Sequence, residues 1–336
     1  MQFSDIRYNS YSKFLKETFG TRVHKVPVHA GFTCPNRDGT VAIGGCTYCN
    51  IDSFTPQSAR ARIPIREQVQ TGIDYLKKRV KAGGFIVYFQ PYSNTYAPLQ
   101  HLQDLYEQAL EHPDVVGISV GTRPDCVDDD KLDYFQQLSH DTFVTIEYGI
   151  ESVHDQTLRI INRGHDYACT VDGIQRTAAR GLNVCGHLIL GFPNETQEQM
   201  FQTVEEVSKL PLTFVKLHNL HIVRYTELAK QYREHPFHIF SFEEWVHMAC
   251  DCLERLNPEF IVERLYGDAP KKLLIEPQWC RNGAKIIHAI QQELKNRNSH
   301  QGRLFEPTLG KSTRAVSEQG LEYESSPRDK DGPLST

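Results

Sequence analysis

The chain has 336 residues, of which 39% are hydrophobic and 24% are charged, and its formal net charge is −5. This composition is typical of a globular protein, and it excludes a long apolar membrane span and a chain-wide electrostatic attraction to nucleic acid. Because the N-terminal segment contains no apolar stretch typical of a secretory signal, we expect a cytoplasmic protein whose nine cysteines stay reduced.

Six apolar runs with the composition of strands recur along the chain, and amphipathic helical stretches separate them. The runs cover residues 23–30, 85–90, 115–121, 142–150, 182–191 and 214–223, and the helical stretches cover residues 66–81, 99–111, 128–139, 168–180 and 195–209. This alternation predicts right-handed βαβ units and a parallel sheet. Six units are too few for a closed eight-stranded barrel, so we expect an α/β fold built as a partial (β/α)6 barrel, with a doubly wound open sheet as the alternative.

The C-terminal part of the chain predicts a helical extension of this barrel. Helical stretches cover residues 242–256 and 282–298, and the segment FIVERLYG between them is compatible with a seventh strand. From residue 307 onward the chain is polar and rich in Ser, Gly and Pro, which is typical of disorder. We therefore expect the barrel in residues 1–230, the extension in residues 231–306 and a disordered tail in residues 307–336.

A cysteine-containing loop, GFTCPNRDGTVAIGGCTYCN, follows the first predicted strand. It carries Cys34, Cys46 and Cys49 among residues typical of turns. Three thiolates without a fourth nearby cysteine would leave one iron of a [4Fe–4S] cluster open to a substrate or cofactor. Loops at the carboxyl ends of strands are also where β/α barrels place their chemistry.

Two other interpretations of this loop remain open from the residues alone. The three cysteines would be buried hydrophobic residues if the loop packed into the core, although its many polar residues disfavour this. They would form a Cys3His zinc site if His29 supplied the fourth ligand, and the chain would then contain a non-catalytic zinc-binding module.

The loop resembles the cluster loop of radical S-adenosylmethionine (SAM) enzymes. Its spacing, Cys34-x11-Cys46-x2-Cys49, is a stretched form that is similar to the radical-SAM domain of the Elongator catalytic subunit. The run GFTCPNRDGT…GGCTYCN resembles the bacterial YhcC-like family even more closely. The resemblance extends over residues 8–301.

This resemblance implies an enzyme that carries a [4Fe–4S] cluster on Cys34, Cys46 and Cys49 and uses SAM as its second cofactor. Reductive cleavage of SAM would give methionine and a 5′-deoxyadenosyl radical, which abstracts hydrogen from a substrate. A flavodoxin or ferredoxin type of one-electron reductant is the implied partner. Likeness to the Elongator subunit implies tRNA as the substrate; a small metabolite or a protein side chain is the alternative.

The resemblance also implies a set of contacts to SAM. Tyr48 would lie near the adenine, Glu151 would bind the ribose, and Arg163 would meet the methionyl carboxylate. Ser93 and Asn94 would hold the methionyl amino group, and His187 stands at a position that contacts the cofactor in related enzymes. The full set of predicted cofactor-binding residues is Tyr48, Ser93, Asn94, Glu147, Glu151, Arg163 and His187.

Strand periodicity adds to this set from the residues themselves. Side chains alternate across a strand, so Glu147 and Glu151 share one face of the fourth predicted strand, and Lys216 and His218 share one face of the sixth. A buried carboxylate requires a partner, which ribose hydroxyls or a structural arginine such as Arg123 would supply. The remaining cysteines are scattered, and we expect them to be buried thiols.

Overall fold

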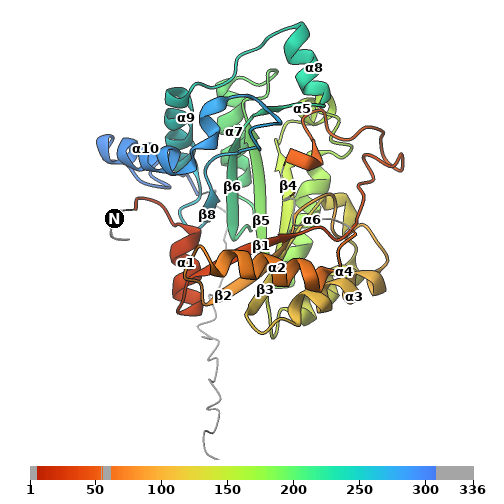
Figure 1. Cartoon of the computed structure of the whole chain (residues 1–336). Coiled ribbons are helices and arrows are strands. Elements are labelled where there is room, and N and C mark those ends of the chain that lie inside the picture. The colour runs from red at the N-terminus through yellow and green to blue at the C-terminus, as the bar shows by residue number, and fades with distance from the viewer. Residues whose placement is uncertain (1–5, 54, 56–61, 308–336) are drawn as a thin grey trace, which may run out of the picture. The chain divides into compact units, whose positions relative to one another are not determined.

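The computed structural model describes residues 6–53, 55 and 62–307 (Figure 1). Its main sheet has seven parallel strands in the order β1-β2-β3-β4-β5-β6-β8. The strands are β1 (Val23–Val28), β2 (Gly84–Phe89), β3 (Val115–Thr122), β4 (Phe143–Glu151), β5 (Asn183–Leu190), β6 (Phe214–Asn219) and β8 (Ile261–Arg264).

Strand order decides between the two predicted architectures. Each strand pairs with the next one along the chain, and the order never reverses as it does in a doubly wound sheet. Right-handed connections that all run in one direction place the helices on one face, and the sheet curls into a half-barrel. The predicted partial barrel is confirmed, and the segment FIVERLYG supplies β8 as a seventh strand.

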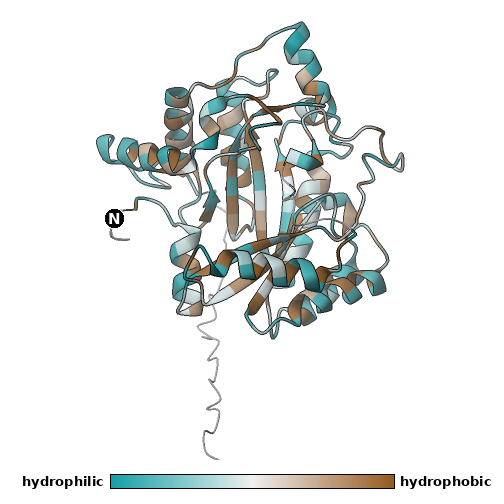
Figure 2. Cartoon of the chain, in the orientation of Figure 1, coloured by the Kyte–Doolittle hydropathy of each residue, from teal (hydrophilic) through white to brown (hydrophobic). Residues whose placement is uncertain are grey.

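Helices cover the convex face of the sheet. They are α2 (Ile65–Lys77), α3 (Leu99–Leu110), α4 (Asp129–Leu138), α6 (Tyr167–Ala179) and α7 (Gln197–Val207). The short helix α5 (Asp155–Ile160) lies at the carboxyl end of the strands (Figure 1), where Leu158 packs with Phe192 and Leu220. Outward strand residues such as Val26, Val87 and Phe89 are fully buried beneath this layer. At Gly72 a Cβ atom would lie 2.4 Å from Val26, so the glycine lets α2 approach β1 closely. Figure 2 shows apolar residues concentrated on the strands and polar residues on the outer helices.

The amino end of the half-barrel is closed by α1 (Tyr11–Phe19). The ring of Tyr11 meets that of Phe214 edge-on at 5.2 Å, and Phe14 packs on Phe143 and Phe214 at 6.2 and 5.2 Å. The amide of Val262 in β8 donates to the carbonyl of Asn9 at 2.7 Å, so the residues before α1 cover the edge of the sheet. This end of the barrel is therefore an apolar floor.

The C-terminal elements are β7 (Ile222–Val223), α8 (Glu227–Glu234), α9 (Phe242–Arg255), β9 (Leu274–Glu276) and α10 (Gly283–Asn296). Ile222 of β7 and Leu228 of α8 pack in a separate small cluster, and α9 and α10 pack on the barrel core. Trp245 of α9 and Ile290 of α10 belong to one hydrophobic cluster with the barrel strands, and the compact unit ends at Glu306. The predicted division at residue 230 stays a prediction, and the predicted tail lies outside the described residues from 308 onward.

Within the described residues, no helix combines the length and the apolar character that crossing a bilayer requires.

Candidate functional site

The three predicted cluster ligands lie in one loop at the carboxyl end of β1. The carbonyl of Cys34 accepts hydrogen bonds from the amides of Arg37 and Asp38 at 2.8 and 3.1 Å, and the amide of Cys49 donates to Cys46 at 3.0 Å. Burial and the neighbouring thiols of Cys46 and Cys34 raise the pKa of Cys49 to about 11. The three cysteines therefore share one folded loop.

The loop is fastened to the residues that follow α5. The amide of Thr47 donates to the carbonyl of Ile161 at 2.9 Å, and Asn162 Nδ2 donates to the carbonyl of Gly45 at 2.8 Å. Asn36 Nδ2 in turn donates to the carbonyl of Asn162. Segments more than a hundred residues apart in sequence thus fix one another.

Arg163 lies at the centre of this junction. Its Nη1 donates to Cys46 Sγ at 3.6 Å, its Nη2 donates to the carbonyl of Gly149 at 2.5 Å, and Nη2 lies 3.7 Å from Glu151 Oε1. A Cβ atom at Gly149 would lie 2.5 Å from both the guanidinium and the Glu151 carboxylate, so only glycine leaves room for this pair. Arg123 does not pair with either predicted carboxylate; it binds Asp125 at 2.7 Å.

The end of β4 departs from regular strand geometry. Glu151 has a φ of 66°, in the left-handed region that non-glycine residues rarely adopt. The pairing with β5 shifts between Gly149 and Glu151, so Glu151 faces Leu188 instead of continuing the regular alternation. This irregularity turns the carboxylate toward Arg163, and backbone strain of this kind is common at functional sites.

The other predicted SAM contacts at this end of the barrel surround the same junction. Tyr48 packs on Phe192, with ring centroids 5.8 Å apart. The amide of Ser93 donates to the carbonyl of Thr33, beside the cysteine loop, at 3.2 Å. Asn94 Nδ2 donates to the carbonyls of Phe89 and Gly121, which links the ends of β2 and β3.

The buried polar atoms near the loop that lack a hydrogen-bond partner within the described residues include Asn36 Oδ1, Ser93 Oγ, Asn94 Oδ1 and Arg163 Nε. Among them, Asn94 Oδ1 is an acceptor and Arg163 Nε is a donor. An amino acid carries one donor group and one acceptor group in its ammonium and carboxylate. The two atoms therefore match the two ends of a methionyl group in type.

A second group of polar side chains lies deeper on the concave face of the sheet. Lys25, Glu147, His187, Lys216 and Glu263 come from five strands, and we call them the ionic layer. The Glu147 carboxylate lies 2.6 Å from Lys25 Nζ, 2.5 Å from Lys216 Nζ and 2.7 Å from His187 Nε2. The Glu263 carboxylate lies 2.6 Å from Lys25 and 3.0 Å from Lys216, so two lysines bridge two carboxylates.

Glu147 stays ionised although its side chain is fully buried. Burial favours the neutral acid, but the ammonium groups of Lys216 and Lys25 outweigh it and hold the pKa of Glu147 well below its ordinary value. The Ser119 hydroxyl donates a further hydrogen bond to it. These partners are all protein side chains, and the contact of Glu147 with SAM stays a prediction.

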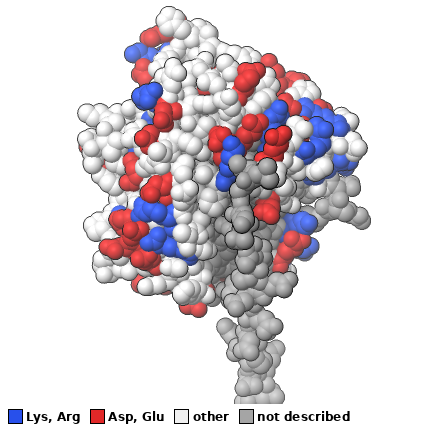
Figure 3. All heavy atoms as spheres, turned by 180° about the vertical axis from the view of Figure 1, so that it is seen from behind, with Lys and Arg blue, Asp and Glu red and all other residues white. Residues whose placement is uncertain are grey.

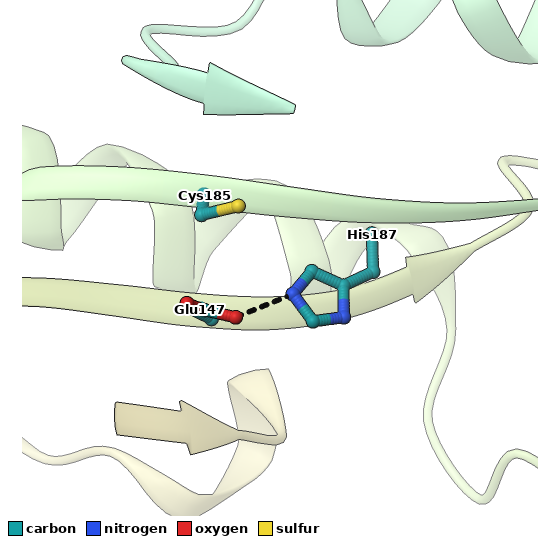
Figure 4. Close-up of side chains that lie close together, drawn as sticks. All are labelled: Glu147, Cys185 and His187. Carbon is teal, nitrogen blue, oxygen red and sulfur yellow. Dashed lines mark hydrogen bonds and ion pairs between the residues drawn. The ribbon is translucent and has the colours of Figure 1, made fainter. Parts of the chain in front are cut away.

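Glu147, Cys185 and His187 form a group whose ligand-type atoms lie within 4.8 Å of one another (Figure 4). A metal ion placed among them would share the Glu147 carboxylate with two ammonium groups that already neutralise it. Burial also raises the pKa of the Cys185 thiol well above its ordinary value, which opposes thiolate formation. These three residues therefore do not suit a metal ion. Glu147 and His187 belong to the ionic layer, and Cys185 belongs to the apolar floor beneath it.

Sequence reasoning did not find Lys25 and Glu263. The sequence pattern that could have identified them is a charged residue at an inward position of an otherwise apolar strand, and this pattern recurs on several strands. The six scattered cysteines are free thiols, and all except the half-buried Cys169 are buried, as expected.

Comparisons with known proteins identify the family. The radical SAM superfamily profile matches residues 34–207, and the radical SAM C-terminal domain profile matches residues 212–296. Uncharacterized protein YtqA of Bacillus subtilis is 39% identical over 89% of this chain and 93% of its own length. Protein YhcC of Escherichia coli is 38% identical, over 82% of this chain and 88% of its own.

More distant similarities cover less of each chain. The tRNA uridine(34) acetyltransferase of Methanocaldococcus infernus is 22% identical over 58% of this chain and 36% of its own length. The solved structure of the Elp3 protein from the same organism superposes with a TM-score of 0.63 at 15% identity, covering 83% of this chain and 64% of that one. The similarity to Elp3 supports the half-barrel fold.

Proposed function

Because the chain belongs to the radical SAM superfamily, as a YhcC-like member, we propose that Cys34, Cys46 and Cys49 hold three irons of its [4Fe–4S] cluster. The chain is a radical SAM enzyme, and the cluster and SAM are its cofactors. The observation that carries the ligand assignment is the set of N–H donors around Cys46. Asn36 Nδ2 and Arg163 Nη1 each lie 3.6 Å from its sulfur.

The donor set fits a cluster of this kind. Three thiols from one loop supply three ligands and leave a fourth iron open. N–H donors and a guanidinium beside a ligating sulfur stabilise its negative charge, which is how proteins tune such clusters. Arg37 adds a second guanidinium at the loop, where its Nη2 donates to the carbonyl of Cys49 at 2.6 Å.

When bound and reduced by one electron, the cluster supplies the electron that cleaves SAM to methionine and a 5′-deoxyadenosyl radical, which takes a hydrogen atom from the substrate. The chain itself binds and orients the reactants and limits access of water. We propose that Arg163 binds the methionyl carboxylate, Asn94 and Ser93 the amino group, Glu151 the ribose, and Tyr48 the adenine. A flavodoxin or ferredoxin type of protein would deliver the electron.

The SAM assignment predicts a defined binding defect. Replacement of Arg163 or Glu151 by alanine should weaken SAM binding by about ten- to a hundred-fold, because each removes a charge-assisted contact of about 1.5–3 kcal/mol. Iron content should stay unchanged. Anaerobic titration with SAM measures the effect, and Arg159→Ala, at an exposed position of α5, is the matched control. Wild-type affinity in both variants would contradict the assignment.

We further propose that the substrate is tRNA. The named activity of the distant M. infernus relative and the stretched cysteine spacing support this. A corner beside the cysteine loop adds physical support. Asn50 Nδ2 donates to the carbonyl of Arg224 at 2.8 Å, and the amide of Arg224 donates to Leu273 at 2.8 Å. This corner therefore gathers Arg224, Tyr225, Lys271 and Lys272.

The side chains of this corner suit a nucleic acid. All four are exposed, and Tyr225 is 88% exposed with a left-handed φ of 65°. An exposed aromatic ring flanked by cations can stack on a base while the cations contact phosphates. The face seen in Figure 3 carries both basic and acidic side chains. Of the arginines that follow the cysteine loop in sequence, Arg60 lies outside the described residues, and Arg66 pairs with Glu111 at 2.5 Å.

The tRNA proposal predicts salt-sensitive binding at this corner. Charge reversal of Lys271 and Lys272 together should weaken tRNA binding and lower the slope of log affinity against log salt by about two, since each phosphate contact contributes about 0.9. Binding measured at several salt concentrations tests this. Reversal of Lys77 and Lys78, at the end of α2, should have little effect. Salt-independent binding and an unchanged nucleoside profile in a deletion strain would favour a small metabolite or a protein side chain.

A further inference from the structure

The concave face of the half-barrel stays accessible above the ionic layer. On β5, His187 and Ile189 are partly exposed, whereas Leu188 and Leu190, which face the helices, are fully buried. On β2, Tyr88 is partly exposed between the fully buried Val87 and Phe89. Inward side chains that keep contact with solvent can be reached by another molecule from the open side of the half-barrel.

His187 presents one defined nitrogen to this space. Its Nε2 lies 2.7 Å from a Glu147 oxygen, and that carboxylate is an acceptor because two ammonium groups keep it ionised. Nε2 must therefore carry the hydrogen, and in a neutral ring Nδ1 then carries a lone pair. Burial and the nearby Lys216 lower the pKa of His187, which favours the neutral ring.

Nδ1 is the group without a partner. It points away from Glu147 in Figure 4, and no described residue forms a hydrogen bond with it. His218 flanks the ring in a stacked arrangement with centroids 5.7 Å apart, which limits the orientations that the ring can adopt. The ring is thus held by Glu147 on one side and by His218 on another.

His187 also lies below the proposed SAM contacts. It faces Gly149 across the sheet, and Glu151 is two residues farther along β4, toward the cysteine loop. Because the pairing is irregular there, Glu151 faces Leu188, the residue after His187, so His187 lies one strand position deeper than the Glu151–Arg163 pair. A molecule between His187 and that pair would lie beside SAM.

The charge balance of the ionic layer indicates which chemical groups fit there. The ammonium groups of Lys25 and Lys216 are matched by the carboxylates of Glu147 and Glu263. Within the described residues the layer therefore offers an acceptor nitrogen and no surplus positive charge. A phosphate or carboxylate would find no counter-charge at this depth, whereas an N–H or O–H group would find an acceptor.

We propose that His187 Nδ1 accepts a hydrogen bond from an N–H or O–H group of the substrate, and that Glu147 is the positioning residue that fixes the ring for this contact. The substrate portion that enters the barrel is then a neutral or cationic donor, such as a nucleobase N–H, a ribose hydroxyl or an amine. The proposal rests on the proposed function, in which SAM is cleaved at the mouth of the barrel. The family resemblance alone implied that His187 contacts the cofactor. The proposal assigns His187 to the substrate instead.

The first test uses the holoenzymes of His187→Phe and His187→Gln. The matched control is His24→Phe, because His24 lies on the outward face of β1, away from the barrel interior. SAM affinity is measured by anaerobic titration. Formation of 5′-deoxyadenosine is then measured with two pools from a deletion strain, bulk tRNA and the small-molecule extract. The wild type and His24→Phe should be stimulated by one pool. His187→Phe should keep its SAM affinity within about twofold, but the stimulation of 5′-deoxyadenosine formation should fall by about ten-fold. In His187→Gln, which keeps an acceptor, the stimulation should fall by less.

The outcomes separate this inference from the proposed function. Stimulation by the small-molecule pool alone would contradict tRNA as the substrate and still test His187 with that pool. A fall in SAM affinity of His187→Phe, or wild-type stimulation of that variant, would overturn the inference.

A second test does not depend on the substrate. Diethylpyrocarbonate reacts with accessible, unprotonated imidazole nitrogens, so the wild-type holoenzyme should be modified at His187 at neutral pH and protected by the stimulating pool. Peptide mass spectrometry locates the modified residue. An unreactive His187 would show that Nδ1 is not available and would overturn the inference.

Discussion

Replacement of Cys34, Cys46 or Cys49 by alanine is expected to remove the [4Fe–4S] cluster and all reductive cleavage of SAM. Each thiolate is proposed to bind one iron, and a cluster left with two protein ligands has lost the site geometry that the loop provides. The expected loss of activity is complete, because reduction of SAM requires the electron that the cluster delivers. Iron and sulfide content, the visible absorption spectrum and 5′-deoxyadenosine formation measure the result.

Cys280→Ala is the matched control, since Cys280 is a fully buried free thiol outside the cysteine loop. This variant should keep the wild-type iron content and spectrum. A Cys34→Ala protein with the full [4Fe–4S] spectrum would contradict the ligand assignment. Zinc in place of iron after anaerobic purification would instead support the Cys3His alternative with His29.

The strands and the cysteine loop were predictable because their signals are local. Apolar runs such as FIVYFQ and VVGISVG became β2 and β3, and the loop residues gave the family resemblance directly. The helix boundaries shifted by a few residues where capping decided them. The stretch predicted as 195–209 begins at Gln197, because Thr196 caps the helix in a reciprocal pair with Gln199.

The ionic layer was not predictable, because its contacts join residues that are far apart in sequence. Lys25 meets Glu147 and Glu263, which are 122 and 238 residues away. Periodicity indicates that a charged residue points inward, but it does not indicate which partner neutralises it. The regular alternation assumed for β4 was also broken, because the irregular pairing at Glu151 depends on the packing of Arg163 against Gly149.

Glu147→Gln is expected to destabilise the folded protein by about 3–5 kcal/mol, the usual cost of removing one partner from a buried ion pair. The change leaves Lys25 and Lys216 with only the Glu263 carboxylate between them, on top of the apolar floor formed by Tyr11 and Phe214. Denaturant unfolding monitored by circular dichroism measures the loss. Glu107→Gln, at an exposed position of α3, is the control and should change stability by less than about 0.5 kcal/mol.

The pH dependence of stability provides a second readout of the same residue. Because the pKa of folded Glu147 lies below the value of about 4.3 for an unfolded glutamate, its contribution is present above that value and is lost as pH falls toward the folded pKa. The wild type should therefore lose more stability than Glu147→Gln as the pH falls below about 4.3, the pKa of an unfolded glutamate. A double variant, Glu147→Gln with Lys216→Met, should recover part of the loss, because it removes one uncompensated charge as well. Equal stability of the wild type and Glu147→Gln at neutral pH would mean that the ionic layer contributes nothing to folding, and that Glu147 is retained for its contact with His187 alone.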